Sequence, residues 1–305
     1  MKFPVHEIPL VEIKVKENIT LFIKREDLVH QAISGNKYWK LFYNINNYLA
    51  KQPEKPQLIT FGGAYSNHIA ATAALGKDLG IATLGIIRGG ELANSWQQNP
   101  TLLQAAENGM KFRFITRQQY RNKSVCSTML EAQFPGALLI PEGGSNATAV
   151  QGVQHMLNKQ TESFDYLCTA VGTGGTAAGL ASFCADHQQV LGFAVVNDSS
   201  LPETINSLKT KGTIQLQEAH DGGYGKITDE NVRFINNFHR QYGIPLDPVY
   251  TGKMMRKLIL MINDNYFPPG SRILAFHTGG LQGIQGANEK LRRTGKPEIN
   301  FTHSL

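Results

Sequence analysis

The chain has 305 residues, of which 41% are hydrophobic and 18% charged, and its formal net charge is +6. This length favours about two domains with a sizeable core. Lysine and arginine are scattered, without the clusters typical of nucleic-acid-binding surfaces, so we expect no nucleic-acid partner. No apolar run approaches the roughly 20 residues of a membrane helix. Pro4 and Pro9 also interrupt any apolar signal segment. We therefore expect a cytoplasmic protein that does not associate with membranes.

The cysteines predict neither disulfides nor a metal site. Cys126, Cys168 and Cys184 form an odd, widely spaced set without a C-x-x-C pair. Cys168 lies in an apolar run, which is typical of a small core residue. We expect no metal among the cofactors.

Strand-like runs that end in glycine alternate with helix-like stretches along the chain. This alternation predicts βαβ units and a mainly parallel sheet, in which ligands collect at the carboxyl ends of the strands. No linker or internal repeat separates the units, so we expect two intertwined domains. The predicted strands lie in LFIKRED, QLITFGG, IATLGIIRGG, KFRFIT, ALLIPEGG, FDYLCTAVGTGG, VLGFAVVND and RILAFHTGG.

The first candidate site is Ser34-Gly35-Asn36-Lys37, which follows LFIKRED. Gly35 permits an unusual backbone angle, and Asn36 can cap the helix that we expect from about this residue. At the start of that helix, desolvation and the helix dipole both lower the pKa of Lys37, as a Schiff-base lysine requires. Taken alone, the motif favours an ordinary lysine in an amphipathic helix.

The second candidate site is Gly62-Gly63-Ala64-Tyr65-Ser66-Asn67-His68, between a predicted strand and a helix. Free backbone amides at the helix start suit a carboxylate or phenolate oxygen. Plain helix capping by Ser66 or Asn67 is the alternative interpretation. His68 by itself is more typical of a packed or exposed histidine than of a general base.

The third candidate site is the glycine-rich run from Gly172 to Gly179. Its consecutive backbone amides and the hydroxyls of Thr173 and Thr176 predict an anion site, such as a phosphate cup. Gly172, Gly174 and Ala177 also satisfy a relaxed dinucleotide fingerprint, with Asp198 near the place of a ribose-binding acid. A nicotinamide-dependent oxidoreductase is therefore an alternative interpretation.

Two tyrosines lie in glycine-rich or proline-containing segments farther along the chain. Tyr224 lies in Gly-Gly-Tyr-Gly, and Tyr250 lies in Asp-Pro-Val-Tyr-Thr-Gly-Lys. Each tyrosine alone is more typical of a structural residue. His277-Thr278-Gly279-Gly280 adds another strand that ends in a glycine-rich turn and could close the same cleft.

The order of these motifs is more specific than any one of them. From end to end, the chain resembles the D-cysteine desulfhydrase and 1-aminocyclopropane-1-carboxylate deaminase family, which shares the fold of the tryptophan synthase β subunit. The resemblance rests on KRED, SGNK, GGAYSN, PEGGSN, GTGGT, GGYG, DPVYTGK and HTGG.

This resemblance implies an α/β fold of two intertwined, open, twisted, mainly parallel sheets flanked by helices. It implies a large domain of residues 1–42 plus 151–305, which binds pyridoxal phosphate, and a smaller α/β domain of residues 43–150. It also implies a homodimer that acts on a small amino acid. A catalytically silent protein that binds the cofactor or an amino acid is the alternative within this fold.

The resemblance also implies roles for single residues. Lys37 looks like the Schiff-base lysine, Asn67 like the partner of the cofactor's phenolate oxygen, and Thr251 like the residue that faces the pyridine nitrogen. Ser66, Asn67, His68 and Tyr224 match substrate-binding positions. The implied phosphate cup is Thr173, Gly174, Gly175 and Thr176, and the implied catalytic set is Lys37, Ser66, Tyr224 and Tyr250. Gly143, Gly144 and Ser145 resemble another wall of the cleft.

Position 251 distinguishes two activities of the family. The cyclopropane deaminases carry a glutamate there, which keeps the pyridine nitrogen protonated and the cofactor a strong electron sink. Thr251 leaves that nitrogen mostly neutral, which suffices for β-elimination. We therefore favour D-cysteine desulfhydrase chemistry, which gives pyruvate, ammonia and hydrogen sulfide. The alternative is 1-aminocyclopropane-1-carboxylate deaminase chemistry, which gives 2-oxobutyrate and ammonia.

Overall fold

The computed structural model describes residues 1–223 and 225–301. Its strands form a six-stranded sheet in the order β1-β2-β10-β7-β8-β9 and a four-stranded sheet in the order β5-β4-β3-β6. Among the strands of these described residues, β1 and β2 pair antiparallel and the other pairs are parallel. The strands of the larger sheet are β1 (Leu10–Lys16), β2 (Ile19–Lys24), β10 (Arg272–Phe276), β7 (Tyr166–Val171), β8 (Gln189–Ala194) and β9 (Ile214–Glu218). Those of the smaller sheet are β5 (Lys111–Ile115), β4 (Ala82–Arg88), β3 (Gln57–Gly62) and β6 (Leu138–Ile140).

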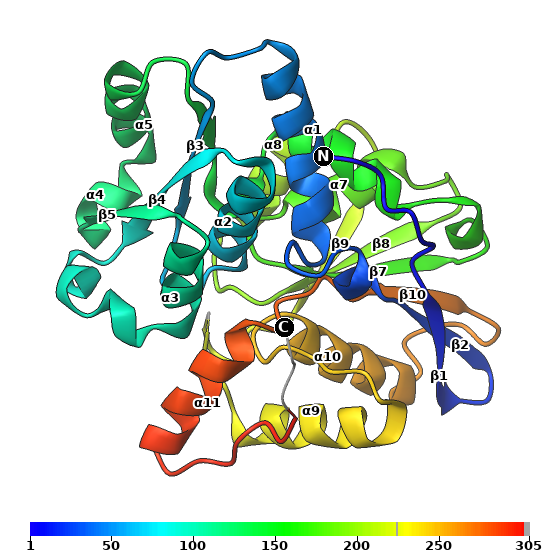
Figure 1. Cartoon of the computed structure of the whole chain (residues 1–305). Helices are drawn as coiled ribbons and strands as arrows, with labels where there is room; N and C mark the ends of the chain where they lie inside the picture. The colour runs from blue at the N-terminus through cyan, green and yellow to red at the C-terminus, as the bar shows by residue number, and fades with distance from the viewer. Residues whose placement is uncertain (224, 302–305) are drawn as a thin grey trace.

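Helices cover both faces of the larger sheet (Figure 1). On one face, α9, α10 and α11 bury a cluster that includes Ile235, Met254 and Leu291 against strand residues such as Ile273. On the other face, α1 lies between the two sheets, and α7 packs against β7, β8 and α6. The helices are α1 (Asn36–Ala50), α2 (Asn67–Leu79), α3 (Pro100–Glu107), α4 (Arg117–Arg121), α5 (Lys123–Gln133), α6 (Ala147–Val153), α7 (Gly175–Phe183), α8 (Leu201–Leu208), α9 (Asp229–Tyr242), α10 (Thr251–Asn263) and α11 (Gly283–Arg293).

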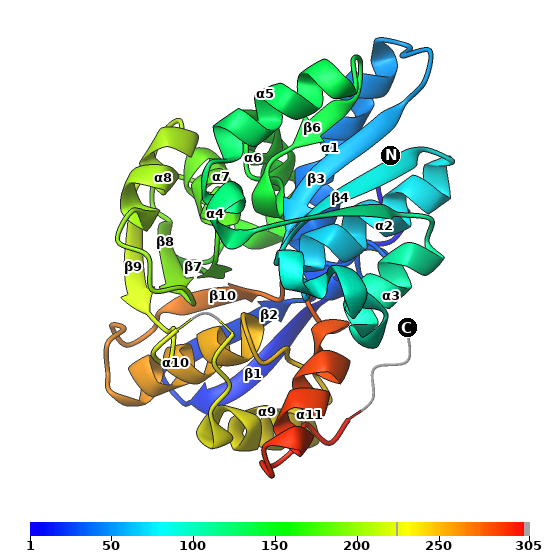
Figure 2. The same cartoon turned by 90° about the vertical axis from the view of Figure 1, so that its left-hand side faces the viewer.

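The two sheets are joined through one apolar cluster around α1. Leu41 and Ile45 of α1 are fully buried, together with Leu58 of the smaller sheet and Leu274 of the larger one. The views in Figures 1 and 2 both show α1 between the sheets. The same core thus contains residues from both sheets. Its packing fixes the two sheets relative to each other, and with them the walls of any cavity where they meet.

The chain leaves the larger sheet after β2, builds the smaller sheet, and returns through α6 to the larger sheet. This path confirms the predicted α/β fold of two intertwined, mainly parallel sheets. The predicted boundaries after residues 42 and 150 fall inside α1 and α6, which pack against each other. The division into two domains therefore stays a prediction. Within the described ranges, no helix is long and apolar enough to span a bilayer.

Candidate active site

A cavity of about 360 Å³ lies where several predicted motifs meet. The start of α1, the turn before α2 and the glycine-rich loop before α7 contribute most of its walls. The predicted site residues that line it are Lys37, Ser66, Asn67, His68, Thr173, Gly174, Gly175, Thr176 and Tyr250. Thr251 is not among the lining residues, and Tyr224 lies outside the described residues. Segments distant in sequence thus converge on one space.

Gly35 is required by the close approach of two loops. Its φ is 66°, and a Cβ there would lie 1.9 Å from the carbonyl oxygen of Thr278. The expectation that Asn36 caps the helix is wrong, because Gly35 is the N-cap residue and no side chain caps α1. The Asn36 side chain instead accepts a hydrogen bond from Lys37 Nζ at 2.9 Å and donates one to Thr176 Oγ1 at 2.7 Å. Asn36 therefore links the lysine to the glycine-rich loop.

Lys37 has an amine suited to nucleophilic chemistry. The side chain is partly exposed, and it lines the cavity. Desolvation lowers the pKa of Lys37 to about 8, although the negative charge of Asp247 raises it. A lowered pKa increases the neutral fraction of the amine, which is the form that attacks a carbonyl carbon.

The loop before α7 forms a cup at the start of that helix. Gly174 is the N-cap residue, with a φ of 81°, which favours glycine. A Cβ on Gly175 would lie 2.7 Å from Ser145 Oγ and 3.0 Å from Lys40 Nζ. Free amides at a helix start bind anions, and two hydroxyls line the cavity beside them, from Thr173 in the loop and Thr176 in the first turn of α7.

Lys40 belongs to this cup but was not among the predicted site residues. It is only 1% exposed, and its Nζ donates to Ser145 Oγ at 2.7 Å, which in turn lies 2.6 Å from Thr173 Oγ1. Desolvation and the nearby charge of Lys37 hold its pKa well below the ordinary value. No carboxylate of the described residues forms an ion pair with it. The signal in the sequence is its spacing, because Lys37 and Lys40 are three residues apart and share one helix face.

The start of α2 forms the opposite wall. Ser66 caps the helix and accepts a hydrogen bond from the amide of Ile69 at 3.3 Å. The side-chain oxygen of Asn67 accepts a hydrogen bond from Gln282 Nε2. A Cβ on Gly280 would lie 2.7 Å from Asn67 Nδ2. Gln282 and Gly280 thus fix Asn67 from the side of the His-Thr-Gly-Gly turn.

His68 is a neutral histidine in this wall. It is 1% exposed, and desolvation, Lys37 and Lys40 hold its pKa well below the ordinary value. The Thr60 hydroxyl donates to the carbonyl of Ile140 at 2.9 Å, so it accepts from His68 Nε2 at 2.8 Å. Nδ1 is then an acceptor, and it has no hydrogen-bond partner in the part of the chain that the structure describes.

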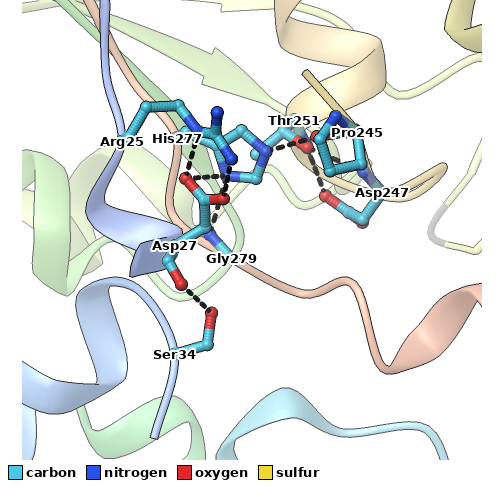
Figure 3. A network of polar contacts seen from close by, with 8 residues as sticks. All are labelled: Arg25, Asp27, Ser34, Pro245, Asp247, Thr251, His277 and Gly279. Atoms are coloured by element: carbon cyan, nitrogen blue, oxygen red, sulfur yellow. Dashed lines mark hydrogen bonds and ion pairs between the residues drawn. The ribbon is translucent and has the colours of Figure 1, made fainter. Parts of the chain in front are cut away.

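Thr251 faces Asp247 and not the cavity (Figure 3). Asp247 Oδ1 accepts from the amide and the hydroxyl of Thr251, both at 2.7 Å, and Oδ2 accepts from the amides of Val249 and Tyr250. Asp247 is therefore saturated by donors from Val249 to Thr251, where α10 begins. Thr278, at the end of β10, does line the cavity. The role implied for Thr251 stays a prediction.

A polar network supports the loop that leads into α1 and Lys37 (Figure 3). Arg25 binds both carboxylate oxygens of Asp27, at 2.8 and 2.7 Å, and His277 Nδ1 lies 3.3 Å from Asp27 Oδ1. The Ser34 hydroxyl donates to the carbonyl of Asp27 at 3.3 Å. His277 Nε2 donates to the carbonyl of Pro245 at 2.6 Å. The network thus joins the ends of β2 and β10 to the loops before α1 and α10.

The donors in the cavity fit pyridoxal phosphate. The cup offers amides, hydroxyls and the amine of Lys40 as donors to a phosphate, which suits an anion of this kind. The amine of Lys37 lines the same cavity, where it would bind the aldehyde. Gly175 leaves space between the loop and Lys40 that any larger side chain would fill.

Comparison with known proteins identifies relatives that match most of the chain. A model described as pyridoxal-phosphate dependent enzyme matches residues 2–279. A Thermotoga maritima protein, provisionally named a 1-aminocyclopropane-1-carboxylate deaminase, is 30% identical over 92% of this chain and 95% of its own length. An Arabidopsis thaliana protein named bifunctional D-cysteine desulfhydrase/1-aminocyclopropane-1-carboxylate deaminase, mitochondrial, is 29% identical over 87% of this chain and 73% of its own length.

A solved structure agrees with these matches. The crystal structure of an ACC deaminase homologue superimposes with a TM-score of 0.79 at 27% identity, covering 96% of this chain and 95% of the other. The predicted resemblance is confirmed, and the oxidoreductase alternative is set aside. The chain is an enzyme of the pyridoxal-phosphate-dependent family, related to the 1-aminocyclopropane-1-carboxylate deaminases and D-cysteine desulfhydrases, and its cofactor is pyridoxal phosphate.

Proposed function

We propose that the enzyme cleaves D-cysteine by β-elimination to pyruvate, ammonia and hydrogen sulfide. The observation that carries the proposal is the meeting, in one cavity, of a lysine of lowered pKa and an anion cup. Bound pyridoxal phosphate supplies an electron sink for the charge that develops at the substrate Cα. A homodimer and a cytoplasmic location remain predictions.

We assign each proposed role to residues that line the cavity. Lys37 binds the cofactor and, once free, accepts the Cα proton of the substrate. Lys40 and the loop before α7 hold the phosphate. Ser66 and Asn67, at the start of α2, bind the substrate carboxylate. The tyrosine ring of Tyr250 packs beside the loop, because a Cβ on Gly172 would lie 3.1 Å from its Cε1.

The distribution of carboxylates supports elimination over opening of a cyclopropane ring. Among the described lining residues, the acids are Glu142 and Asp198, and both also line the adjoining outer hollow. Asp247 accepts four hydrogen bonds and is 2% exposed. Because no other carboxylate of the described residues lines the cavity, the electron sink would be of the weaker kind that β-elimination tolerates. The names of several relatives make the cyclopropane substrate the second candidate.

Product analysis tests the proposal. Purified enzyme should be yellow, release sulfide and pyruvate in equal amounts from D-cysteine, and form almost no 2-oxobutyrate from the cyclopropane acid. The reverse pattern would refute the choice of substrate.

Substitution of the lysine tests the proposed mechanism. Lys37→Ala should abolish turnover while leaving the circular dichroism unchanged. Lys51→Ala, at the exposed far end of the same helix, is the matched control and should remain active. Full activity of Lys37→Ala would refute the proposed role of this amine.

A further inference from the structure

An outer hollow of about 1140 Å³ adjoins the cavity. Residues that line both spaces form the mouth between them, and we call this set the mouth: Gly63, Ala64, Tyr65, Arg88, Glu142 and Asp198. Ser66 and Asn67 line the inner cavity but not the hollow. A substrate bound through its α-carboxylate at the start of α2 therefore has room to extend a long substituent through the mouth.

Arg88 is positioned at the mouth by the smaller sheet. It is the last residue of β4, which runs parallel to β3 with Gly62 opposite Ile87 (Figure 2). A Cβ on Gly63 would lie 3.5 Å from Arg88 Nη2. The guanidinium thus lies over the turn that leads into Ser66. Its strand, β4, is the neighbour of β3, and β3 leads into α2, whose start is the proposed binding site of the substrate carboxylate.

An aromatic ring orients this guanidinium. Its central carbon lies 5.6 Å from the centroid of the Tyr120 ring, which is 3% exposed and packs against Phe61. Lys123 Nζ lies 5.0 Å from the same centroid. A guanidinium that stacks on the face of a ring keeps its N–H groups, which lie in its own plane, available for hydrogen bonds. Tyr120 therefore supports Arg88 without neutralising its charge.

The acids at the mouth already have partners. Glu142 pairs with Lys123, and Asp198 accepts from the amide and hydroxyl of Ser200 at 2.9 and 2.7 Å. Arg117, farther out in the hollow, pairs with Glu91 at 3.0 Å. Arg88 is exposed, and no carboxylate within the described ranges forms an ion pair with it. The uncompensated charge at the mouth is thus the positive charge of Arg88, whose guanidinium can bind a carboxylate through two parallel hydrogen bonds.

We propose that Arg88 is an anion subsite that binds an acidic group at the far end of the substrate's β-substituent. This inference rests on the proposed β-elimination and names its substrate class: a β-substituted alanine whose leaving group carries a carboxylate. For an S-carboxymethyl substituent, the Cβ–S bond breaks and sulfur leaves with a proton as mercaptoacetate. One water is consumed as the remaining three-carbon unit becomes pyruvate and ammonia, so no oxidant or reductant is needed.

A pair of ligands that differ only in charge tests the subsite by turnover. S-(carboxymethyl)-D-cysteine and S-(carbamoylmethyl)-D-cysteine should differ at least tenfold in kcat/KM in favour of the acid. Arg88→Gln should remove this preference and leave kcat/KM for D-cysteine within about twofold. Arg117→Gln removes the same charge from the hollow and should keep the preference.

A binding measurement needs no turnover. D-Glutamate and D-glutamine lack a β-leaving group, and calorimetry on the holoenzyme should show tighter binding of D-glutamate, again lost in Arg88→Gln. Equal binding of both ligands by the wild type would overturn the inference. So would an equal loss of kcat/KM for D-cysteine in Arg88→Gln, which would assign Arg88 to the α-carboxylate. Absence of pyruvate from every cysteine derivative, with the charge preference in binding intact, would instead overturn the proposed function alone.

Discussion

Lys37 and Lys40 lie on one face of α1, and their surroundings suit them to different roles. Lys37 lines the cavity and bonds to Asn36, whereas Lys40 is fully buried beside the glycine-rich loop. The local motif around Lys37 favours an ordinary lysine, and it is the order of the motifs along the chain, through the family resemblance, that points to Lys37. Lys40 could not be assigned in this way, since its partner Ser145 is 105 residues away.

The first prediction concerns Lys40. Lys40→Met should weaken binding of pyridoxal phosphate about ten- to one-hundredfold, as expected when one charge-assisted hydrogen bond is lost. A titration of the cofactor-free protein, followed by visible absorbance, measures this effect. Lys51→Met is the control, and it should bind as the wild type does. If affinity for pyridoxal, which lacks the phosphate, falls equally, the proposed contact with the phosphate is wrong.

The second prediction concerns the pH dependence of cofactor capture by Lys37. Desolvation lowers the pKa of this amine to about 8, against the opposing effect of Asp247. Because the neutral amine attacks the aldehyde, the rate of colour formation should rise with pH up to about 8 and then level off. An ordinary lysine would continue to gain reactivity to about pH 10. Stopped-flow absorbance measures the rate, and a rise that continues to that pH would contradict the assignment.

At the scale of elements, the predicted strands that feed helices are confirmed. β3, β4 and β7 are continuous apolar runs that end in or before glycine, as buried parallel strands do. The predicted strands do not include β1 and β9, the two edge strands of the larger sheet. Both alternate apolar and polar residues, LVEIKVK and IQLQE, which is the period of a half-buried strand, and Ile13 of β1 is buried. Neither strand ends in the glycine-rich turn by which most of the other strands are recognised, so the pattern used to find those strands passes over both edges.

Glycine also sets how closely the helices pack. A Cβ on Gly152 of α6 would lie 1.9 Å from the carbonyl oxygen of Trp39 in α1. Gly152→Ala should therefore destabilise the protein by about 2–3 kcal/mol, because a backbone atom cannot yield as a side chain can. Urea unfolding measures the change. Gly283→Ala, in the open first turn of α11, should cost nothing, and equal effects of the two substitutions would refute the packing argument.

At the scale of the whole molecule, the network around Asp27 joins three segments that are distant in sequence, residues 25–34, 245–251 and 277–279 (Figure 3). Burial acts to raise the pKa of Asp27, but His277 and Arg25 outweigh it and hold the pKa below its ordinary value. The KRED and HTGG motifs are visible in the sequence, yet their direct contact is not. It depends on the pairing of β10 with β2, which brings residues about 250 positions apart into register.

The charge of Asp27 should stabilise the fold in a defined pH range. Its lowered pKa means that the contribution is complete above the unfolded pKa near 3.8 and is lost as the pH falls through the folded value. Asp27→Asn should cost about 3–5 kcal/mol near neutral pH, because Arg25 loses its buried partner. Urea unfolding at pH 7 and near pH 3 should show this difference shrinking in acid. Glu91→Gln, which breaks an exposed pair, should leave the unfolding midpoint nearly unchanged. A deficit that persists undiminished in acid would contradict the role of the charge.

The position of β10 has a consequence for synthesis of the protein. This strand, Arg272–Phe276, lies between β2 and β7 in the larger sheet, yet it leaves the ribosome after every other strand (Figure 1). Until it emerges, β2 and β7 have no common neighbour, and the wall formed by Thr278 is missing from the cavity. A nascent chain therefore carries Lys37 from its earliest stage without a pocket to hold the cofactor. We therefore expect cofactor loading to wait until this late strand completes the sheet that the early strands began.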